Sequence, residues 1–255
     1  MLFENIIVGP IHSRRLGTSL GVNVLPTQKK YCSFDCVYCE CGWNEIDTRT
    51  HIGFNDKEKI KESLLYWCEN HSQQERKKVD SITFSGNGEP TLHPDILAIV
   101  QDVIELRDKY LPQAKVTILT NSTNLYREDV RKALHLIDNP ILKLDAGTEE
   151  TYKRINKPVS AKFSDIVGYL KEFGNKAIIQ TILLRSKNKA EEINNTTPQE
   201  FNAWLSIVKE IKPRLVMLYV IDRATPDPDL IRLDKQEMEQ FADKVRALGI
   251  ETECY

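Results

Sequence analysis

Short runs rich in Val, Ile and Leu alternate along the chain with longer segments that are apolar on one helical face only. The runs are almost continuously apolar, as expected for strands covered on both faces of a sheet. They occupy residues 21–25, 81–86, 115–121, 141–146, 176–185 and 215–221, and residues 250–254 form a possible final strand. The pattern predicts about six parallel strands.

The intervening segments place apolar residues three and four positions apart, which is the spacing of an amphipathic helix. They span residues 57–70, 94–110, 127–137, 163–173, 198–211 and 235–249. Pro94 and Pro198 are placed for the first turn of a helix, Thr197 for an N-cap, and Gly249 for a C-cap.

Strands that alternate with helices predict right-handed βαβ units and a parallel sheet. The 255 residues are too few for eight such units. We therefore predict an α/β fold with a partial (β/α)6 TIM-like barrel, formed by one domain over residues 1–255. A doubly wound sheet is the alternative.

The charge of the chain is nearly balanced, with 35 Lys and Arg against 37 Asp and Glu. The chain therefore has no general attraction to nucleic acid, and an RNA would need a local patch. His12, Arg14 and Arg15 are candidates for such a patch, although an arginine pair is more often a solvated or structural feature. The N-terminus lacks the features of a signal peptide, and no apolar run approaches the roughly 20 residues that span a bilayer. These features predict a cytoplasmic protein.

Four of the six cysteines lie between Cys32 and Cys41, which is a poor match to a disulfide framework and favours metal binding. Cys32, Cys36 and Cys39 have the spacing C-x3-C-x2-C and follow the first predicted strand. A cubane iron–sulfur cluster usually takes four thiolates, so three would leave one iron open. The alternative is a zinc site with Cys41 as the fourth ligand. Cys68 and Cys254 are interpreted as buried or incidental thiols.

Polar residues at the ends of the later strands form a second group of candidates. The second predicted strand ends in Gly86-Asn87-Gly88-Glu89-Pro90, where glycines let the backbone approach a ligand closely. Asn121 ends the third strand, and Lys143 and Asp145 share one face of the fourth. Charges in an apolar strand must be paired or reach a polar interior. Arg185 ends the fifth strand.

Several of these segments resemble the radical S-adenosylmethionine (radical SAM) superfamily. The cysteine spacing with an aromatic residue at Tyr38 resembles its cluster motif, and GNGEP resembles its GGEP motif. The stretches 9–26, 33–42, 143–158 and 218–229 resemble a group of small bacterial and archaeal proteins. That group is related to the enzyme that builds the tricyclic base of wybutosine in tRNA.

The resemblance implies a [4Fe–4S] cluster on Cys32, Cys36 and Cys39. It also implies S-adenosylmethionine (SAM) as a cofactor, which the cluster cleaves reductively to a 5′-deoxyadenosyl radical. That radical would abstract hydrogen from a small molecule, a peptide or an RNA nucleotide, and a flavodoxin- or ferredoxin-type protein would supply the electron. The positions implied for SAM binding are Tyr38, Gly86, Asn87, Gly88, Glu89, Asn121, Lys143, Asp145 and Arg185.

Two other functions remain open from the sequence. One is an activating enzyme for a glycyl-radical partner protein, and the other is a zinc-binding adaptor without catalysis. No residue is assigned as a catalytic acid or base, because radical abstraction can proceed without one.

Overall fold

The computed structural model describes residues 2–44, 53–187 and 193–255, and the chain divides into two compact units. The first unit consists of Met1–Cys32, Asn44–Thr120 and Asn124–Pro140. The second consists of Ser33–Trp43, Asn121–Thr123 and Ile141–Tyr255. A single domain over the whole chain remains a prediction.

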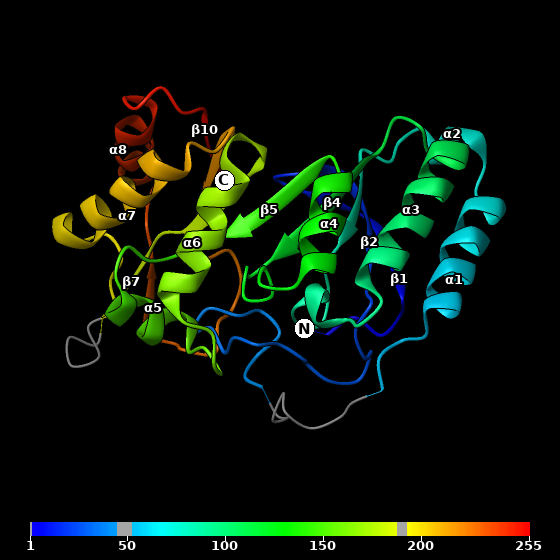
Figure 1. Ribbon diagram of the computed structural model, residues 1–255, viewed down its shortest axis with the longest axis horizontal. Helices are drawn as coiled ribbons and strands as arrows, with labels where there is room; N and C mark the ends of the chain where they lie inside the picture. Colours follow the sequence, from blue (N-terminus) through cyan, green and yellow to red (C-terminus); the bar gives the residue numbers. More distant parts are fainter. Residues whose placement is uncertain (1, 45–52, 188–192) are drawn as a thin grey trace. The chain divides into compact units, whose positions relative to one another are not determined.

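In the first unit four strands lie in the order β1-β2-β3-β4. β1 runs antiparallel to β2, and the other three are mutually parallel. Their side-by-side helices α1, α3 and α4 lie over the sheet in Figure 1. The bounds are β1 Ile7–Ser13, β2 Gly17–Val22, β3 Ser81–Phe84, β4 Lys115–Thr120, α1 Lys57–Asn70, α2 Gln73–Arg76, η1 Pro90–Leu92, α3 Ile96–Tyr110 and α4 Glu128–Leu136.

In the second unit β5, which enters it at Ile141, is followed by β6, β8 and β10 in that order, and the four strands are parallel. A separate antiparallel ribbon is formed by β7 and β9. The bounds are β5 Asn139–Lys143, α5 Glu149–Asn156, α6 Phe163–Phe173, η2 Gly174–Lys176, β6 Ile178–Ile182, β7 Leu184–Ser186, α7 Pro198–Ile211, β8 Leu215–Tyr219, β9 Leu230–Arg232, α8 Lys235–Arg246 and β10 Thr252–Cys254.

Burial follows the predicted pattern within both units. All four residues of β3 and all five of β6 are buried, so these strands are covered on both faces. On α1 the buried residues Ile60, Leu64, Trp67 and Cys68 recur at helical spacing. The side chain of Thr197 accepts a hydrogen bond from the backbone N–H of Glu200, so it caps α7 as predicted, and Pro198 is the first residue of that helix.

Some predicted boundaries are wrong. The fifth strand was expected over residues 176–185, but β6 ends at Ile182 and Arg185 lies on β7. Pro94 precedes α3, which begins at Ile96. Gly249 has the left-handed φ of +76°, but Ala247 is the C-cap of α8.

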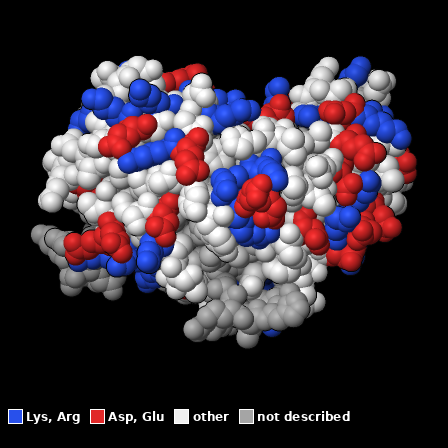
Figure 2. Space-filling model, viewed as in Figure 1, with Lys and Arg blue, Asp and Glu red and all other residues white. Residues whose placement is uncertain are grey.

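Basic and acidic side chains are interspersed on the face shown in Figure 2, in agreement with the near balance of charge. Within the described parts of the chain, we find no helix that is both long and apolar enough to cross a membrane.

Candidate functional site

The cysteine loop, Ser33–Trp43, is shaped by two tight turns and belongs to the second unit. The backbone N–H of Cys39 donates to the carbonyl of Cys36 (3.1 Å), and that of Gly42 donates to the carbonyl of Cys39 (2.9 Å). The loop is also bound to the end of α5, because Val37 N donates to Ile155 O (3.0 Å). These bonds fix Cys36 and Cys39 on neighbouring turns.

None of the six cysteines is joined in a disulfide. Cys36 is buried, whereas Cys32, Cys39 and Cys41 are half-buried. Burial raises the pKa of the Cys36 thiol to about 11, and the positive charge of Lys143 opposes that shift. A bound metal ion displaces the thiol proton, so cysteines outside disulfides are the form from which a cluster assembles.

Among residues 2–44, 53–187 and 193–255, no three Cys, His, Asp or Glu side chains are grouped as they would be around one metal ion. In a cubane cluster each thiolate binds a different iron, so its ligands do not converge on one point. Cys32 lies in the first unit, and Cys36 and Cys39 lie in the second. What the structure shows is a donor set that suits iron: cysteines outside disulfides, one of which, Cys36, accepts an N–H hydrogen bond from Asn156.

A buried polar group lies beside Cys36, and we call it the Lys143 cluster: Tyr38, Lys143, Asp145, Asn156 and Tyr219. Lys143 Nζ donates to the hydroxyls of Tyr38 (2.8 Å) and Tyr219 (3.1 Å). It lies 3.6 Å from Oδ2 of Asp145, whose side chain is 0% exposed. The Lys143 ammonium thus neutralises a carboxylate that would be costly to bury alone.

The carboxylate of Asp145 accepts hydrogen bonds at both oxygens. Oδ2 accepts from the Tyr38 hydroxyl and, at 2.8 Å, from Asn156 Nδ2. Oδ1 accepts from the backbone N–H of Ile182 (3.1 Å). The Asp145 carboxylate is therefore held rigidly by hydrogen bonds at both of its oxygens.

Two pKa values in the Lys143 cluster are strongly shifted. Burial disfavours the charged form of Lys143, but Asp145 and the Tyr219 hydroxyl outweigh burial and raise the pKa of Lys143. Burial, followed by the Asp145 charge, raises the pKa of Tyr38. Tyr38 is therefore a neutral phenol and Lys143 a cation at neutral pH.

The sequence predicted Lys143 and Asp145 on one face of a strand over residues 141–146. That boundary is wrong, because β5 ends at Lys143 and Asp145 lies beyond it. The structure nevertheless brings both residues together with Tyr38. Sequence reasoning missed Asn156 and Tyr219. Both lie in stretches used for the family resemblance, which was the one signal for them.

The GNGEP turn of the first unit holds the residue that precedes Cys32. Tyr31 N donates to Asn87 O (2.7 Å), and Glu89 N donates to Tyr31 O (3.0 Å). A Cβ atom on Gly88 would lie 1.8 Å from Tyr31 O, and φ at Gly88 is +141°. Gly88 is therefore required so that the chain entering the cysteine loop can lie against the turn.

The side chains of this turn are buried and bonded. Asn87 Nδ2 donates to Phe3 O (2.9 Å) and Pro26 O (2.8 Å), and its Oδ1 accepts from Phe3 N (2.7 Å). These bonds use the amide of Asn87 to hold the surrounding chain. A Cβ atom on Gly86 would lie 2.4 Å from Asn23 Oδ1, so glycine at position 86 allows the Asn23 side chain to lie close to the backbone of the turn.

The carboxylate of Glu89 is only 2% exposed. Its Oε1 accepts hydrogen bonds from the hydroxyls of Thr91 (2.5 Å) and Thr120 (2.7 Å) and from Thr91 N (3.0 Å). Three donors at one oxygen hold the carboxylate in a single orientation.

Asn121 and Arg185, the other two predicted SAM-binding residues, form hydrogen bonds outside both the GNGEP turn and the Lys143 cluster. Asn121 forms a small network in the second unit, with Nδ2 donating to Ser33 Oγ (2.9 Å) and Oδ1 accepting from Thr123 N (3.0 Å). Arg185 donates through Nη2 to Glu237 Oε1 on α8. Because Arg185 lies on β7, the strand-end argument for its prediction fails.

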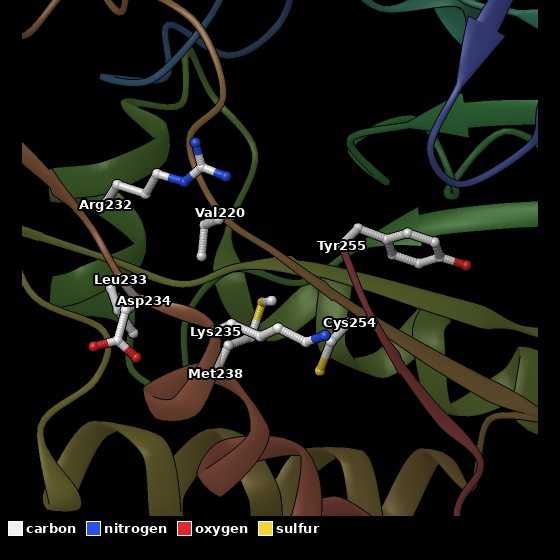
Figure 3. A pocket seen from close by; sticks show the side chains of 8 residues that line it. All are labelled: Val220, Arg232, Leu233, Asp234, Lys235, Met238, Cys254 and Tyr255. Carbon is white, nitrogen blue, oxygen red and sulfur yellow. The ribbon is translucent and has the colours of Figure 1, made fainter.

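The remaining cysteines agree with the interpretation as ordinary thiols. Cys68 is 0% exposed on α1. Burial raises the pKa of both Cys68 and Cys254 to about 11. Cys254 borders a cavity of about 510 Å³ in the second unit (Figure 3). That cavity is lined by Val220, Arg232, Leu233, Asp234, Lys235, Met238, Cys254 and Tyr255.

A family model described as "Radical SAM superfamily" matches residues 29–196. The sequence is 32% identical over 244 residues to a protein named GTPase Obg of Brachyspira hyodysenteriae, covering 92% of this chain and 32% of that protein. It is 34% identical over 192 residues to a UPF0026 protein of Methanocaldococcus jannaschii, covering 73% of this chain and 56% of that protein. The chain therefore spans less than two thirds of the length of either relative.

Two solved structures have the same fold. A radical SAM methyltransferase from Sphaerobacter thermophilus matches with a TM-score of 0.65 at 12% identity, over 93% of this chain and 65% of that one. TYW1 with a lysine–pyruvate adduct bound matches with a TM-score of 0.64 at 14% identity, over 91% of this chain and 75% of that one. These matches confirm the predicted α/β fold class, a partial (β/α)6 TIM-like barrel.

Proposed function

The chain belongs to the radical SAM superfamily, and from this premise we propose that Cys32, Cys36 and Cys39 hold its [4Fe–4S] cluster. Members of this superfamily are enzymes that use such a cluster together with SAM. When bound, the reduced cluster supplies one electron to the sulfonium of SAM, which yields methionine and a 5′-deoxyadenosyl radical. Family membership therefore favours the enzyme over the zinc-binding adaptor.

One observation carries the proposal most strongly: within the first unit, Tyr31 is bonded to the GNGEP turn. Some 50 residues of sequence separate the two motifs, yet Asn87 O and Glu89 N bind the backbone of the residue next to Cys32. These bonds hold the GNGEP turn against the residue that precedes Cys32. A SAM molecule bound to the open iron would therefore lie close to the turn, which supports the proposed site.

The residues of the turn have different proposed roles. Glu89 presents an oriented, buried carboxylate, which suits the cationic amino group of SAM. Gly86 and Gly88 permit the close approach of backbone, and Asn87 holds the turn in place. These are positioning roles except for Glu89, which we propose as a direct ligand of SAM.

In the second unit we propose that Lys143 contacts SAM while Tyr38 and Asp145 hold it in place, and that Asn121 contributes its side-chain amide. The cation of Lys143 suits a carboxylate, while the phenol of Tyr38 is held by two partners. We propose that Arg185 anchors α8 through Glu237 instead of binding SAM.

We further propose that the radical abstracts hydrogen from a separate substrate in an oxidoreductase- or lyase-type reaction. The electron would come from a flavodoxin- or ferredoxin-type protein. The substrate class stays open between a small molecule, a peptide and an RNA nucleotide, and so does activation of a glycyl-radical partner.

The test is SAM cleavage by the anaerobically reconstituted protein with dithionite, measured as 5′-deoxyadenosine by chromatography. We expect product from the parent, none from Cys36→Ala, and parental amounts from Cys41→Ala, which is the matched control in the same loop. Equal product from the parent and Cys36→Ala would contradict the proposed ligand set.

A further inference from the structure

Asn156, the last residue of α5, presents its side-chain amide to the sulfur of Cys36. The residue is 1% exposed, and its Nδ2 lies 3.5 Å from Cys36 Sγ and 2.8 Å from Asp145 Oδ2. An asparagine amide has two N–H donors. Nδ2 also lies 3.5 Å from the Tyr38 hydroxyl, which is long for a bond to oxygen but not for one to the larger sulfur atom. The two N–H groups therefore go to Asp145 and Cys36.

Asp145 decides which end of the amide faces the sulfur. An ionised carboxylate can only accept hydrogen bonds, so the amide must direct its NH2 group, not its oxygen, toward Asp145. Lys143 and Tyr38 hold that carboxylate in turn. The orientation of the amide is thus set by the charges of the Lys143 cluster.

The backbone fixes the distance between the amide and the sulfur. Asn156 O accepts from Asp35 N (2.9 Å), and the preceding carbonyl, Ile155 O, accepts from Val37 N (3.0 Å). These two bonds flank Cys36 in the loop. The end of α5 and the loop therefore move together, and the amide stays against the sulfur.

We propose that Asn156 is a positioning residue that raises the reduction potential of the cluster by donating an N–H hydrogen bond to Cys36 Sγ. The inference rests on the proposed function, because that function makes Cys36 an iron ligand. Reduction adds negative charge to the cluster and its thiolates, so an N–H donor stabilises the reduced form more than the oxidised one. Asn156 would thereby make the first electron easier to accept.

The test compares Asn156→Leu, which keeps the size of the side chain and removes both donors, with the parent. Tyr152→Phe is the matched control on the same helix, since the Tyr152 hydroxyl donates to Ala161 O (3.0 Å) and not to sulfur. Redox titration followed by electron paramagnetic resonance gives the midpoint potential of each cluster.

For Asn156→Leu we expect about a tenfold lower ratio of reduced to oxidised cluster at a fixed potential, which is ~59 mV for one electron. Tyr152→Phe should match the parent. A fully loaded Asn156→Leu protein with the parental potential would overturn the inference alone. A parent that assembles no [4Fe–4S] cluster would overturn the proposed function instead.

A second measurement covers the case in which Asn156→Leu fails to assemble a cluster. The reduced parent, grown with nitrogen-15-labelled asparagine, is studied by electron–nuclear double resonance. A nitrogen-15 coupling to the cluster supports the N–H···S bond. Its absence in a fully loaded sample refutes that bond.

Discussion

Replacing Gly88 by alanine should destabilise the protein strongly, because the backbone of Tyr31 occupies the space that a Cβ atom needs. The added atom would lie 1.8 Å from Tyr31 O and 2.4 Å from Tyr31 C, both of which are rigid backbone atoms. The φ of +141° adds strain for any residue with a side chain. Strain of this kind costs about 1–3 kcal/mol, and overpacking costs about as much again.

The combined cost is therefore about 4 kcal/mol, which corresponds to a fall in Tm of roughly 8–16 °C in a chain of this size. Circular dichroism on heating measures that fall. Gly168→Ala is the control, because Gly168 is an exposed helical glycine with no atom within 4 Å of the added Cβ. That change should stabilise by about 1 kcal/mol. A Gly88→Ala protein with the parental Tm would refute the close approach of Tyr31.

Three further predictions concern single groups. Lys143→Met should lower the free energy of unfolding in urea by about 3–5 kcal/mol, because it leaves the buried Asp145 carboxylate uncompensated. Adding Asp145→Asn to that variant should recover much of the lost stability. Full additivity of the two single costs would argue against the pairing. His93 is 2% exposed and neutral, since its Nδ1 accepts from Asp95 N (3.0 Å) and its Nε2 donates to Asn55 O (2.8 Å), and burial lowers its pKa. The stabilising contribution of neutral His93 should be complete above a pH of about 6.5 and be lost as the pH falls toward the lowered pKa. Over this window the unfolding free energy of His93→Gln should therefore depend less on pH than that of the parent. Equal slopes of unfolding free energy against pH would contradict this. Arg185→Met should leave the SAM affinity within about twofold by calorimetry and cost at most about 1 kcal/mol, because its ion pair with Glu237 is half-exposed; a tenfold loss of affinity would restore the original prediction.

Periodicity predicted the buried parallel strands well because apolar runs covered on both faces leave a strong signal. It missed β1, whose residues are mostly exposed and half-buried and which contains Gly9-Pro10. It also overran β6, since apolar residues continue to Leu184 although the strand ends at Ile182. At the end of β6, Asn195 Nδ2 donates a hydrogen bond to Ile182 O (2.6 Å). The local pattern of apolar residues does not predict a bond to a residue this far along the chain.

In the candidate site, too, the sequence predicted local features but not long-range contacts. The spacing of Cys36 and Cys39 and the closeness of Lys143 and Asp145 in the chain are local properties, so the sequence contains them. The predicted strand face is not what joins Lys143 and Asp145, because β5 ends at Lys143. The contact of Asn156 with Cys36 joins residues 120 positions apart, and only folding creates it. The need for glycine at position 88 likewise arises from Tyr31, a residue from another part of the chain.

The central claim is that three cysteines hold a [4Fe–4S] cluster with one iron open to SAM. The most direct measurement is iron and sulfide counting on the anaerobically reconstituted protein, with electron paramagnetic resonance of the reduced form before and after SAM is added. We expect about four irons and four sulfides per chain and a spectrum that changes when SAM binds. A colourless protein with stoichiometric zinc, or a cluster whose spectrum SAM leaves unchanged, would contradict it.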